Sequence, residues 1–337
     1  MPPARPALCL IYRQPAPGFF SIEKGFSLVE SELGRFLSVR RFVLPHARLT
    51  LLNLCRNTLA VRREKAGLFH VTGHAHYAVL SFPASRSLLT IHDCGFLYQG
   101  ARTRRSLLKK LLLDWPVRHS RFITTVSEHS RQDILHHTGC SPEKVVTIPL
   151  PVSPSISFLP KPFNRAQPVL LFLGWKPNKN LPRVIEALRD LPCLLEVVGT
   201  IPPEQEDRLR AWRIAYRQSS GLTDQEVAGK YAACDIVLFP SLFEGLGLPI
   251  VEAQQAGRPV LTSDLSPMKE VAGGAACLVD PSSVPSIRAG LVRLLQDEAY
   301  RHALVNKGFQ NVQQYHPGAV AERYLALYQR LLAENQA

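Results

Sequence analysis

Two glutamates, Glu244 and Glu252, stand eight residues apart on either side of a segment that holds two glycines. The segment follows the apolar run 235–239, which predicts a buried strand, and it precedes a helix predicted to start near Pro249. Backbone N–H groups at a helix N-terminus bind anions such as phosphate. A carboxylate beside them repels phosphate but accepts hydrogen bonds from sugar hydroxyls. The stretch therefore predicts a site for a diphosphate with a hydroxylated ring at each end, which describes a nucleotide sugar.

The helix of this stretch is predicted to stop at Gly257, with Pro259 just beyond its end. Glu252 is expected in its first turn. An acid in that position also stabilises a helix without any ligand, and Glu244 could equally be a surface residue in a turn. The residue types alone leave both interpretations open.

Several spaced motifs resemble the donor-binding signature of retaining glycosyltransferase family 4. They are Glu-Gly-Leu-Gly-Leu-Pro at 244–249, Glu-Ala at 252–253 and Gly-Arg-Pro-Val at 257–260, with 222–226, 231–235 and 270–274 in the family's order. The similarity covers most of residues 169–330 and, more loosely, the N-terminal half. It implies an α/β protein of the GT-B fold, in which two Rossmann-like domains face each other across a cleft.

The resemblance also implies roles for individual residues. Those implied as catalytic are Glu244, His92 and Lys179. Those implied to bind the nucleotide-sugar donor are Gly174, Lys176, Lys179, Asn180, Gly199, Leu222, Glu244, Gly245, Leu246, Gly247, Leu248 and Glu252. Those implied to bind the acceptor are Gly18, His74 and Ser127.

Two loops depart from the family pattern. Gly18 is the only glycine of loop 13–21, which is often glycine-rich in the family and lies against the donor diphosphate. Trp175 stands where the family often has arginine, so Lys176 is expected to substitute for it. Without a ligand, the same positions can be interpreted as a plain turn, surface lysines and structural histidines at strand ends.

The resemblance implies retaining transfer of a hexose from a nucleotide sugar to a hydroxyl of a glycan or lipid-linked acceptor, in surface polysaccharide synthesis. It implies no covalent intermediate and no cofactor. A metal ion is not expected, because Lys179 and helix N–H groups can neutralise the diphosphate. Similarity to bacterial mannosyltransferases favours mannose from GDP-mannose. UDP-glucose or a UDP-N-acetylhexosamine as donor, and a catalytically silent sugar-binding relative, are the alternatives.

The length of 337 residues predicts two domains, and the hydrophobic share of 46% lets both bury a core. Six prolines between positions 149 and 168 indicate an extended linker. We expect an N-terminal acceptor-binding Rossmann-like domain at 1–160 and a C-terminal nucleotide-sugar-binding Rossmann-like domain at 166–312. The family implies that a last helix within 313–337 packs back on the first domain.

The net charge of +13 lies wholly in the N-terminal half, where residues 1–165 hold 23 Lys and Arg against 9 Asp and Glu. The segment 101–115 predicts a basic amphipathic helix with Leu108, Leu111, Leu112 and Trp115 on one face. Such a surface attracts an anionic membrane or a lipid-linked diphosphate, although a basic helix packed on a sheet needs no partner. A nucleic-acid partner is not expected, because no nucleic-acid-binding module is recognisable.

The seven cysteines are scattered without a CxxC pair, which indicates reduced core residues rather than a disulfide framework or a zinc site. No apolar run approaches the length of a membrane span, and the N-terminal apolar run is too short for a signal peptide. We therefore expect a cytoplasmic protein that binds peripherally to the inner face of the cell membrane.

Overall fold

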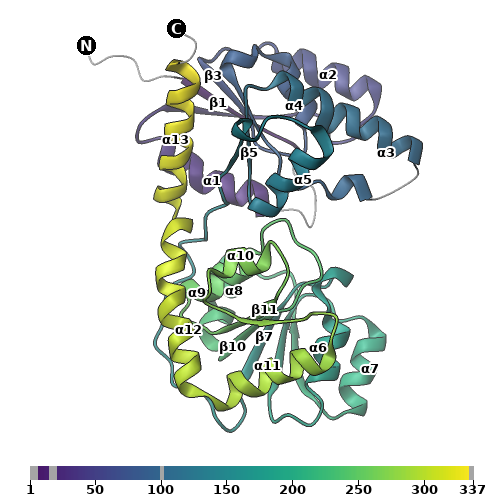
Figure 1. Cartoon of the computed structure of the whole chain (residues 1–337), viewed down its shortest axis with the longest axis vertical. Coiled ribbons are helices and arrows are strands. Elements are labelled where there is room, and N and C mark those ends of the chain that lie inside the picture. Colours follow the sequence, from purple (N-terminus) through teal and green to yellow (C-terminus); the bar gives the residue numbers. More distant parts are fainter. Residues whose placement is uncertain (1–6, 15–20, 99–101, 334–337) are drawn as a thin grey trace. The chain divides into compact units, whose positions relative to one another are not determined.

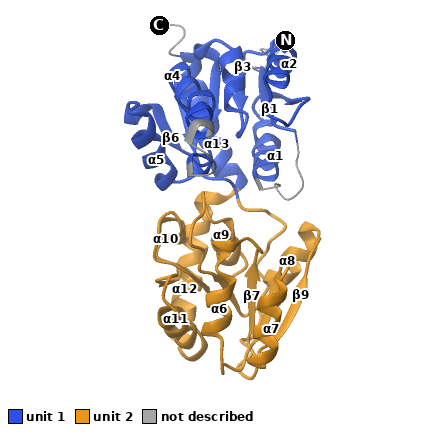
Figure 2. Cartoon of the chain, turned by 90° about the vertical axis from the view of Figure 1, so that its right-hand side faces the viewer, with its two compact units in different colours: residues 1–151, 317–337 blue, residues 152–316 orange. Residues whose placement is uncertain are grey.

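The computed structural model describes residues 7–14, 21–98 and 102–333 (Figure 1). The chain forms two compact units, which Figure 2 colours separately. Unit 1 holds residues 1–151 and 317–337, and unit 2 holds residues 152–316. The last helix of the chain therefore belongs to the unit that the N-terminal half builds.

Unit 1 is built on a six-stranded parallel sheet with the strand order β2-β1-β3-β4-β5-β6. Its strands are β1 (Ala7–Tyr12), β2 (Ser38–Val43), β3 (Leu68–Val71), β4 (Ser87–Thr90), β5 (Phe122–Thr125) and β6 (Val145–Thr147). The central strands β3, β4 and β5 are buried along their whole length, as expected for parallel strands covered by helices on both faces. The edge strand β2 is largely exposed.

Helices connect these strands and flank the sheet. The α-helices of unit 1 are α1 (Ser21–Leu33), α2 (Leu51–Val61), α3 (Arg102–Lys109), α4 (Trp115–His119), α5 (Glu128–Thr138) and α13 (Pro317–Ala333). Its other helical turns are η1 (His76–Ser81), η2 (Ala84–Arg86), η3 (Gly95–Tyr98), η4 (Lys110–Asp114) and η5 (Pro142–Lys144).

The C-terminal helix α13 packs on α1 and completes the core of unit 1. The hydroxyl of its Tyr328 lies 2.6 Å from Nδ1 of His70, and Nε2 of His70 lies 2.7 Å from Oγ1 of Thr90. The ring of Phe26 on α1 meets the His70 ring edge-on. Burial lowers the pKa of His70 to about 3, so the imidazole is neutral between its two hydrogen-bond partners.

The protein is expected to lose stability as the pH falls below about 6.5, where histidines of the unfolded chain take up a proton. Burial in unit 1 lowers the pKa of His70 to about 3 and that of His76 to about 4. The unfolded state therefore binds more protons than the folded state at acid pH, and protonation favours unfolding. Differential scanning calorimetry at about pH 7, 6 and 5 is expected to show a falling Tm. A constant Tm over this interval would contradict the burial of neutral histidines.

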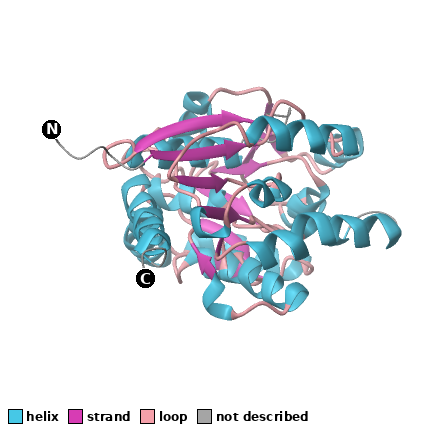
Figure 3. Cartoon of the chain, turned by 90° about the horizontal axis from the view of Figure 1, so that it is seen from above, coloured by secondary structure: helices cyan, strands magenta, loops and turns pink. Residues whose placement is uncertain are grey.

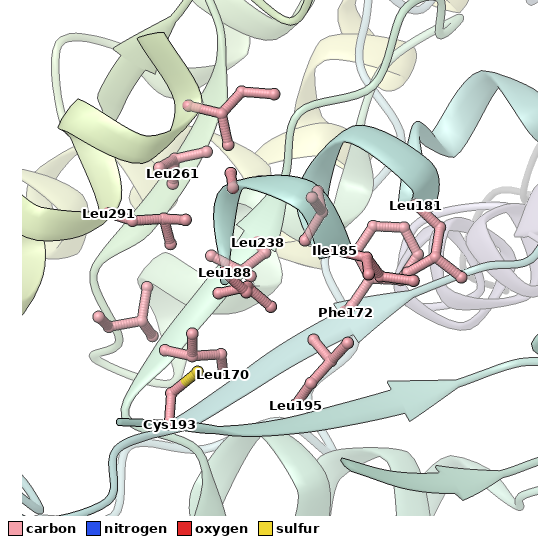
Figure 4. Close-up of a cluster of buried hydrophobic side chains, with 14 of the residues drawn as sticks. Leu170, Phe172, Leu181, Ile185, Leu188, Cys193, Leu195, Leu238, Leu261 and Leu291 are labelled. Carbon is pink, nitrogen blue, oxygen red and sulfur yellow. The ribbon is translucent and has the colours of Figure 1, made fainter. Parts of the chain in front are cut away.

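Unit 2 contains a second six-stranded parallel sheet, with the order β12-β11-β10-β7-β8-β9. Its strands are β7 (Val169–Leu173), β8 (Leu194–Val198), β9 (Ala215–Ser219), β10 (Ile236–Phe239), β11 (Val260–Ser263) and β12 (Cys277–Val279). Apolar side chains of β7, β8 and β10 pack against Leu181, Ile185 and Leu188 to form the core on one face of this sheet (Figure 4).

Helices again flank the strands (Figure 3). The α-helices of unit 2 are α6 (Leu181–Ala187), α7 (Pro203–Ala211), α8 (Asp224–Ala233), α9 (Leu248–Gln255), α10 (Met268–Ala272), α11 (Val284–Gln296) and α12 (Glu298–Asn311). Two 3-10 turns, η6 (Pro177–Lys179) and η7 (Val312–Tyr315), complete the unit.

The helix predicted at 101–115 is interrupted within the described residues. α3 ends at Lys109, and five residues of π-helix precede α4. Because a π turn holds more residues than an α turn, it rotates later side chains away from the face that regular helical spacing predicts. Leu112 and Leu113 are buried, whereas Leu107 and Trp115 are 63% and 49% exposed. The prediction that Trp115 shares one face with the leucines is therefore wrong.

The seven cysteines all lie within the described residues, and none forms a disulfide. Five are buried, but Cys55 is exposed on α2 and Cys140 is half-buried. The interpretation as core residues therefore fails for Cys55. In the described ranges, no helix combines the length and the apolar character that crossing a bilayer requires.

Candidate functional site

The candidate site of unit 2 lies where the neighbouring strands β7 and β10 end. Since the two strands are parallel and paired, the loops that follow them meet at one edge of the sheet. Asn180 joins the two loops: its amide nitrogen donates to the carbonyls of Pro240 and Pro281, at 3.1 and 2.7 Å. It also adopts a left-handed conformation, with φ of 70°. Both amide hydrogens are thus used within the protein, which favours a positioning role for this side chain.

Two of the residues expected to be catalytic contact each other. Nζ of Lys179 donates to Oε1 of Glu244 at 2.6 Å and lies 4.5 Å from the centre of the Phe239 ring. Asn178 donates to the same carboxylate oxygen at 3.3 Å and to the carbonyl of Phe243 at 2.9 Å. The side chains of Lys179 and Glu244 are 19% and 14% exposed. The fold therefore places a cation and an acid next to each other at one edge of the sheet, where both side chains remain partly exposed to solvent.

Two glycines make room for the lysine. Gly174 has φ of 104°, and a Cβ atom there would lie 2.8 Å from Cγ of Lys179. Gly199 has φ of 147°, and a Cβ atom there would lie 3.0 Å from the carbonyl carbon of Gly174. Any side chain would be strained in both conformations, so the two glycines let the lysine stem lie directly over the backbone at the strand ends.

Helix α9 begins at Leu248, next to Pro249 as predicted. Gly247, with φ of 98°, is its N-cap, and Pro249 is the second helical residue. Glu252 is then the fifth residue and lies in the second turn, so its predicted place in the first turn is wrong. Gly247 in a left-handed conformation and Pro249 in the first turn both favour a helix start at this point.

The carboxylate of Glu252 is held by Tyr231, for which no individual role was expected. The hydroxyl of Tyr231, at the end of α8, donates to Oε2 of Glu252 at 2.6 Å. Tyr231 is fully buried, and burial, together with the charge of Glu252, raises its pKa well above the ordinary value. The hydroxyl therefore stays protonated and orients Glu252. The motif 231–235 contained this residue, but only a three-dimensional contact shows its partner.

The other residues expected to bind the donor also lie on these loops. Lys176 is exposed after β7, Leu222 is half-buried in the turn before α8, and Leu246 is buried before α9. Gly245 and Leu248 complete the segment between Glu244 and the helix. Among the described residues, no group of three or more His, Cys, Asp or Glu side chains is placed to hold a metal ion.

The third residue expected to be catalytic, His92, lies at the end of β4 in unit 1. It is buried, and its Nε2 lies 2.8 Å from the carbonyl oxygen of Thr72, so Nε2 is the protonated nitrogen. Burial lowers its pKa. Gly73 approaches closely, because a Cβ atom there would lie 2.6 Å from the His92 ring. These contacts fix the ring and its tautomer.

The residues expected to bind the acceptor have different surroundings. His74 is exposed with φ of 48°, and its ring centre lies 6.2 Å from that of His92. Ser127 is buried and caps α5 by accepting a hydrogen bond from the amide of Ser130 at 3.2 Å. Gly18 lies outside the described residues.

Both halves of the chain match a glycosyltransferase family model. Residues 14–156 match the model described as Glycosyltransferase Family 4, and residues 167–297 match the one described as Glycosyl transferases group 1. Two parallel-sheet units with these matches define a glycosyltransferase of the GT-B fold. The chain belongs to the family 4 glycosyltransferases, which confirms the resemblance seen in its motifs.

The chain is also similar to individual proteins. It is 27% identical over 316 residues to the O-antigen chain mannosyltransferase B of Escherichia coli, covering 85% of this chain and 80% of that protein. It is 30% identical over 228 residues to the MMP alpha-(1->4)-mannosyltransferase of Mycolicibacterium hassiacum, covering 64% of this chain and 55% of that protein.

Among solved structures, sucrose-phosphate synthase from Thermosynechococcus elongatus superposes with a TM-score of 0.77. The identity is 17%, and the match covers 98% of this chain and 100% of that one. The likeness confirms the predicted α/β fold with two Rossmann-like units.

Proposed function

We propose that this glycosyltransferase transfers mannose from GDP-mannose, with retention of configuration, to a hydroxyl of a glycan or lipid-linked acceptor. The observation that carries the proposal is the ion pair between Lys179 and Glu244. Glu244 lies three residues before Gly247, the N-cap of α9. Similarity to two proteins named as mannosyltransferases favours mannose as the transferred sugar.

In the proposed mechanism, Lys179 stabilises the negative charge that builds on the departing nucleoside diphosphate. Its ammonium group has three N–H donors, so it can donate to a phosphate oxygen while it keeps Glu244. Backbone N–H groups at the N-terminus of α9 supply further donors. No metal ion is needed for this charge stabilisation.

The two glutamates orient the sugars. An ionised carboxylate offers about four acceptor positions, so Glu252 can accept from the Tyr231 hydroxyl and from sugar hydroxyls together. A phosphate oxygen of the donor takes the proton of the acceptor hydroxyl, which attacks on the face that the diphosphate leaves. The configuration at the sugar carbon is then retained without a covalent intermediate.

Nucleotides are expected to raise the Tm of the protein in the order GDP, then UDP and ADP, because a ligand that binds only the folded state stabilises it. Differential scanning fluorimetry with the three diphosphates at equal concentration tests the order. Lys179→Met is the matched control and is expected to reduce every shift. A larger Tm shift with UDP than with GDP would indicate that the donor is a UDP-sugar and not GDP-mannose. Binding of GDP-mannose without its turnover on any lipid-linked or glycan acceptor would indicate a silent relative.

We further propose that unit 1 binds an anionic membrane surface. Helix α2 exposes three leucines beside basic residues: Leu51, Leu52 and Leu59 are 83%, 59% and 62% exposed, and Arg56 and Arg62 are exposed on the same segment. Exposed leucines next to arginines are typical of helices that lie in a membrane interface. Together with the excess of positive charge in the N-terminal half, this favours lipid-linked acceptors.

The protein is expected to sediment with vesicles that contain phosphatidylglycerol at low ionic strength, and much less with phosphatidylcholine alone. The double variant Leu51→Gln/Leu52→Gln is expected to sediment several-fold less, because it removes the apolar contact. Leu278→Gln, an exposed leucine of unit 2, is the matched control and is expected to behave as the unchanged protein. Equal binding to neutral and anionic vesicles would count against a role for charge.

A further inference from the structure

Unit 2 contains a pocket of about 540 Å³ at the edge of its sheet opposite the candidate donor site. The pocket reaches Asp235, just before β10, whereas the donor loops follow Phe239 at the other end of that strand. A strand of this length spans roughly 13 Å. Linker residues between 158 and 165, the two residues before β10, the segment 257–259 and the helix α12 line the pocket. The pocket is therefore separate from the residues expected to bind the nucleotide sugar.

Arg258 is one of two buried arginines in the pocket wall. It is 6% exposed. Its Nε donates to the carbonyl of Tyr231 at 3.0 Å, and its Nη2 donates to the carbonyls of Leu159 and Ala232 at 2.8 and 2.7 Å. Its Nη1 makes no hydrogen bond within the described chain. The backbone carbonyls fix the guanidinium group but do not neutralise its charge.

Arg301 on α12 is the second buried arginine in the pocket wall. It is 5% exposed, and its Nη1 donates to the carbonyls of Leu294 and Leu295 at 2.8 and 3.2 Å. The guanidinium carbon lies 3.8 Å from the centre of the Phe163 ring. Among residues 7–14, 21–98 and 102–333, Nε and Nη2 of Arg301 have no hydrogen-bond partner. Burial lowers the pKa of this group, against the opposing charges of Glu298, Asp297 and Asp235.

The carboxylates of the pocket are already paired with other cations. Asp235 pairs with Lys161 and also accepts from the amide of Val169 at 2.7 Å. Glu298 pairs with Arg165 at 2.5 Å. The lining thus holds four Lys and Arg cations against two carboxylates, and the cations left without a carboxylate are the two buried arginines. A buried charge without a partner is costly, so an anion that enters the pocket gains a strong interaction.

Part of the lining is aromatic. Phe158 and Phe309 form an edge-to-face pair with ring centres 5.1 Å apart. Gly257 lies directly beneath them, because a Cβ atom there would be 2.5 Å from the Phe158 ring. The volume lies within the range of pockets that hold small organic ligands, and planar guanidinium groups suit phosphate oxygens.

From these observations we propose that the pocket is a second ligand site, which binds a small phosphorylated organic compound. Arg258 and Arg301 hold the phosphate, and the phenylalanines hold the organic part. The site does not depend on which sugar nucleotide the enzyme uses.

Phenyl phosphate is a suitable probe, titrated into the full chain by isothermal calorimetry. Asn306, which is exposed on the pocket rim, allows a charge to be added with almost no change in shape. Asn306→Asp is expected to weaken binding of phenyl phosphate about fivefold or more, whereas the matched control Asn306→Gln leaves it unchanged. Arg301→Lys keeps the charge but loses the planar fork, and is expected to weaken binding about tenfold.

The same titration separates this pocket from the donor site. Lys179→Met is expected to bind phenyl phosphate as the unchanged protein does, and phenol without phosphate is expected not to bind. No measurable binding at millimolar phenyl phosphate would overturn the proposal. So would equal affinities of the Asn306→Asp and Asn306→Gln variants. A loss of binding in Lys179→Met would assign the phosphate to the donor site instead. Because Asn306 lies on the rim, the test stands even where Arg301→Lys fails to fold.

Discussion

Replacing Glu252 with alanine is expected to lower sugar transfer by about 10²-fold or more, while the fold is kept. A hydrogen bond to a charged group contributes about 1.5–3 kcal/mol, and a carboxylate that accepts from two sugar hydroxyls contributes more than one such bond. Glu252 is half-buried, and Tyr231 holds it in place. Release of nucleoside diphosphate from the sugar donor measures the loss, and circular dichroism checks the fold.

Two further variants test whether the effect is specific to Glu252 and how far it depends on the Tyr231 hydroxyl that orients its carboxylate. Tyr231→Phe keeps the ring but removes the hydroxyl that orients the carboxylate, so an intermediate loss of activity is expected. Glu204→Ala removes an exposed acid on α7 and is expected to have no effect. Full activity of Glu252→Ala would refute the role assigned to this residue.

Replacing Lys179 with methionine is expected to have the second large effect. The change removes the cation proposed to meet the diphosphate and leaves Glu244 without its 2.6 Å partner. Loss of one preorganised donor to a developing charge typically lowers kcat by about 10²–10³-fold. Nucleotide affinity is expected to fall as well, because Glu244 then repels the phosphates.

The double variant Lys179→Met/Glu244→Gln distinguishes a catalytic lysine from a merely structural ion pair. It removes both charges, so the Tm is expected to recover relative to Lys179→Met, since no carboxylate is left unpaired. Activity is expected to stay low. Recovery of activity together with the Tm would show that the lysine serves only to neutralise Glu244.

The elements around the site could be predicted because their sequence patterns are strong. The sequence predicts a strand at 235–239 and helices near 283–296 and 298–312, and these ranges agree with β10, α11 and α12 to within one residue. Buried parallel strands are continuous apolar runs, and these helices are bounded by Ser283 and Asp297, whose side chains cap them. The edge strands β2 and β9 contain no such apolar run, because Ser38–Val43 and Ala215–Ser219 have polar residues on exposed faces.

The contacts of the site could not be predicted, because they join residues that are distant in the sequence. Lys179 and Glu244 are 65 residues apart, and Tyr231 and Glu252 are 21 apart. Sequence spacing cannot show that the side-chain amide of Asn180 donates hydrogen bonds to the carbonyls of Pro240 and Pro281. Motifs identify which residues gather at the end of a sheet, whereas side-chain partners depend on how the loops pack.

The main chain passes between the two units twice, after Pro151 and again before Pro317. Val152 donates to the carbonyl of Tyr315 at 2.8 Å, so the two passages are joined within unit 2. Proteolytic nicking of the proline-rich linker would therefore not release two independent halves. The carboxy-terminal fragment would keep α13, which completes the core around Phe26 and His70, and the nicked enzyme would persist as a non-covalent complex of its own pieces.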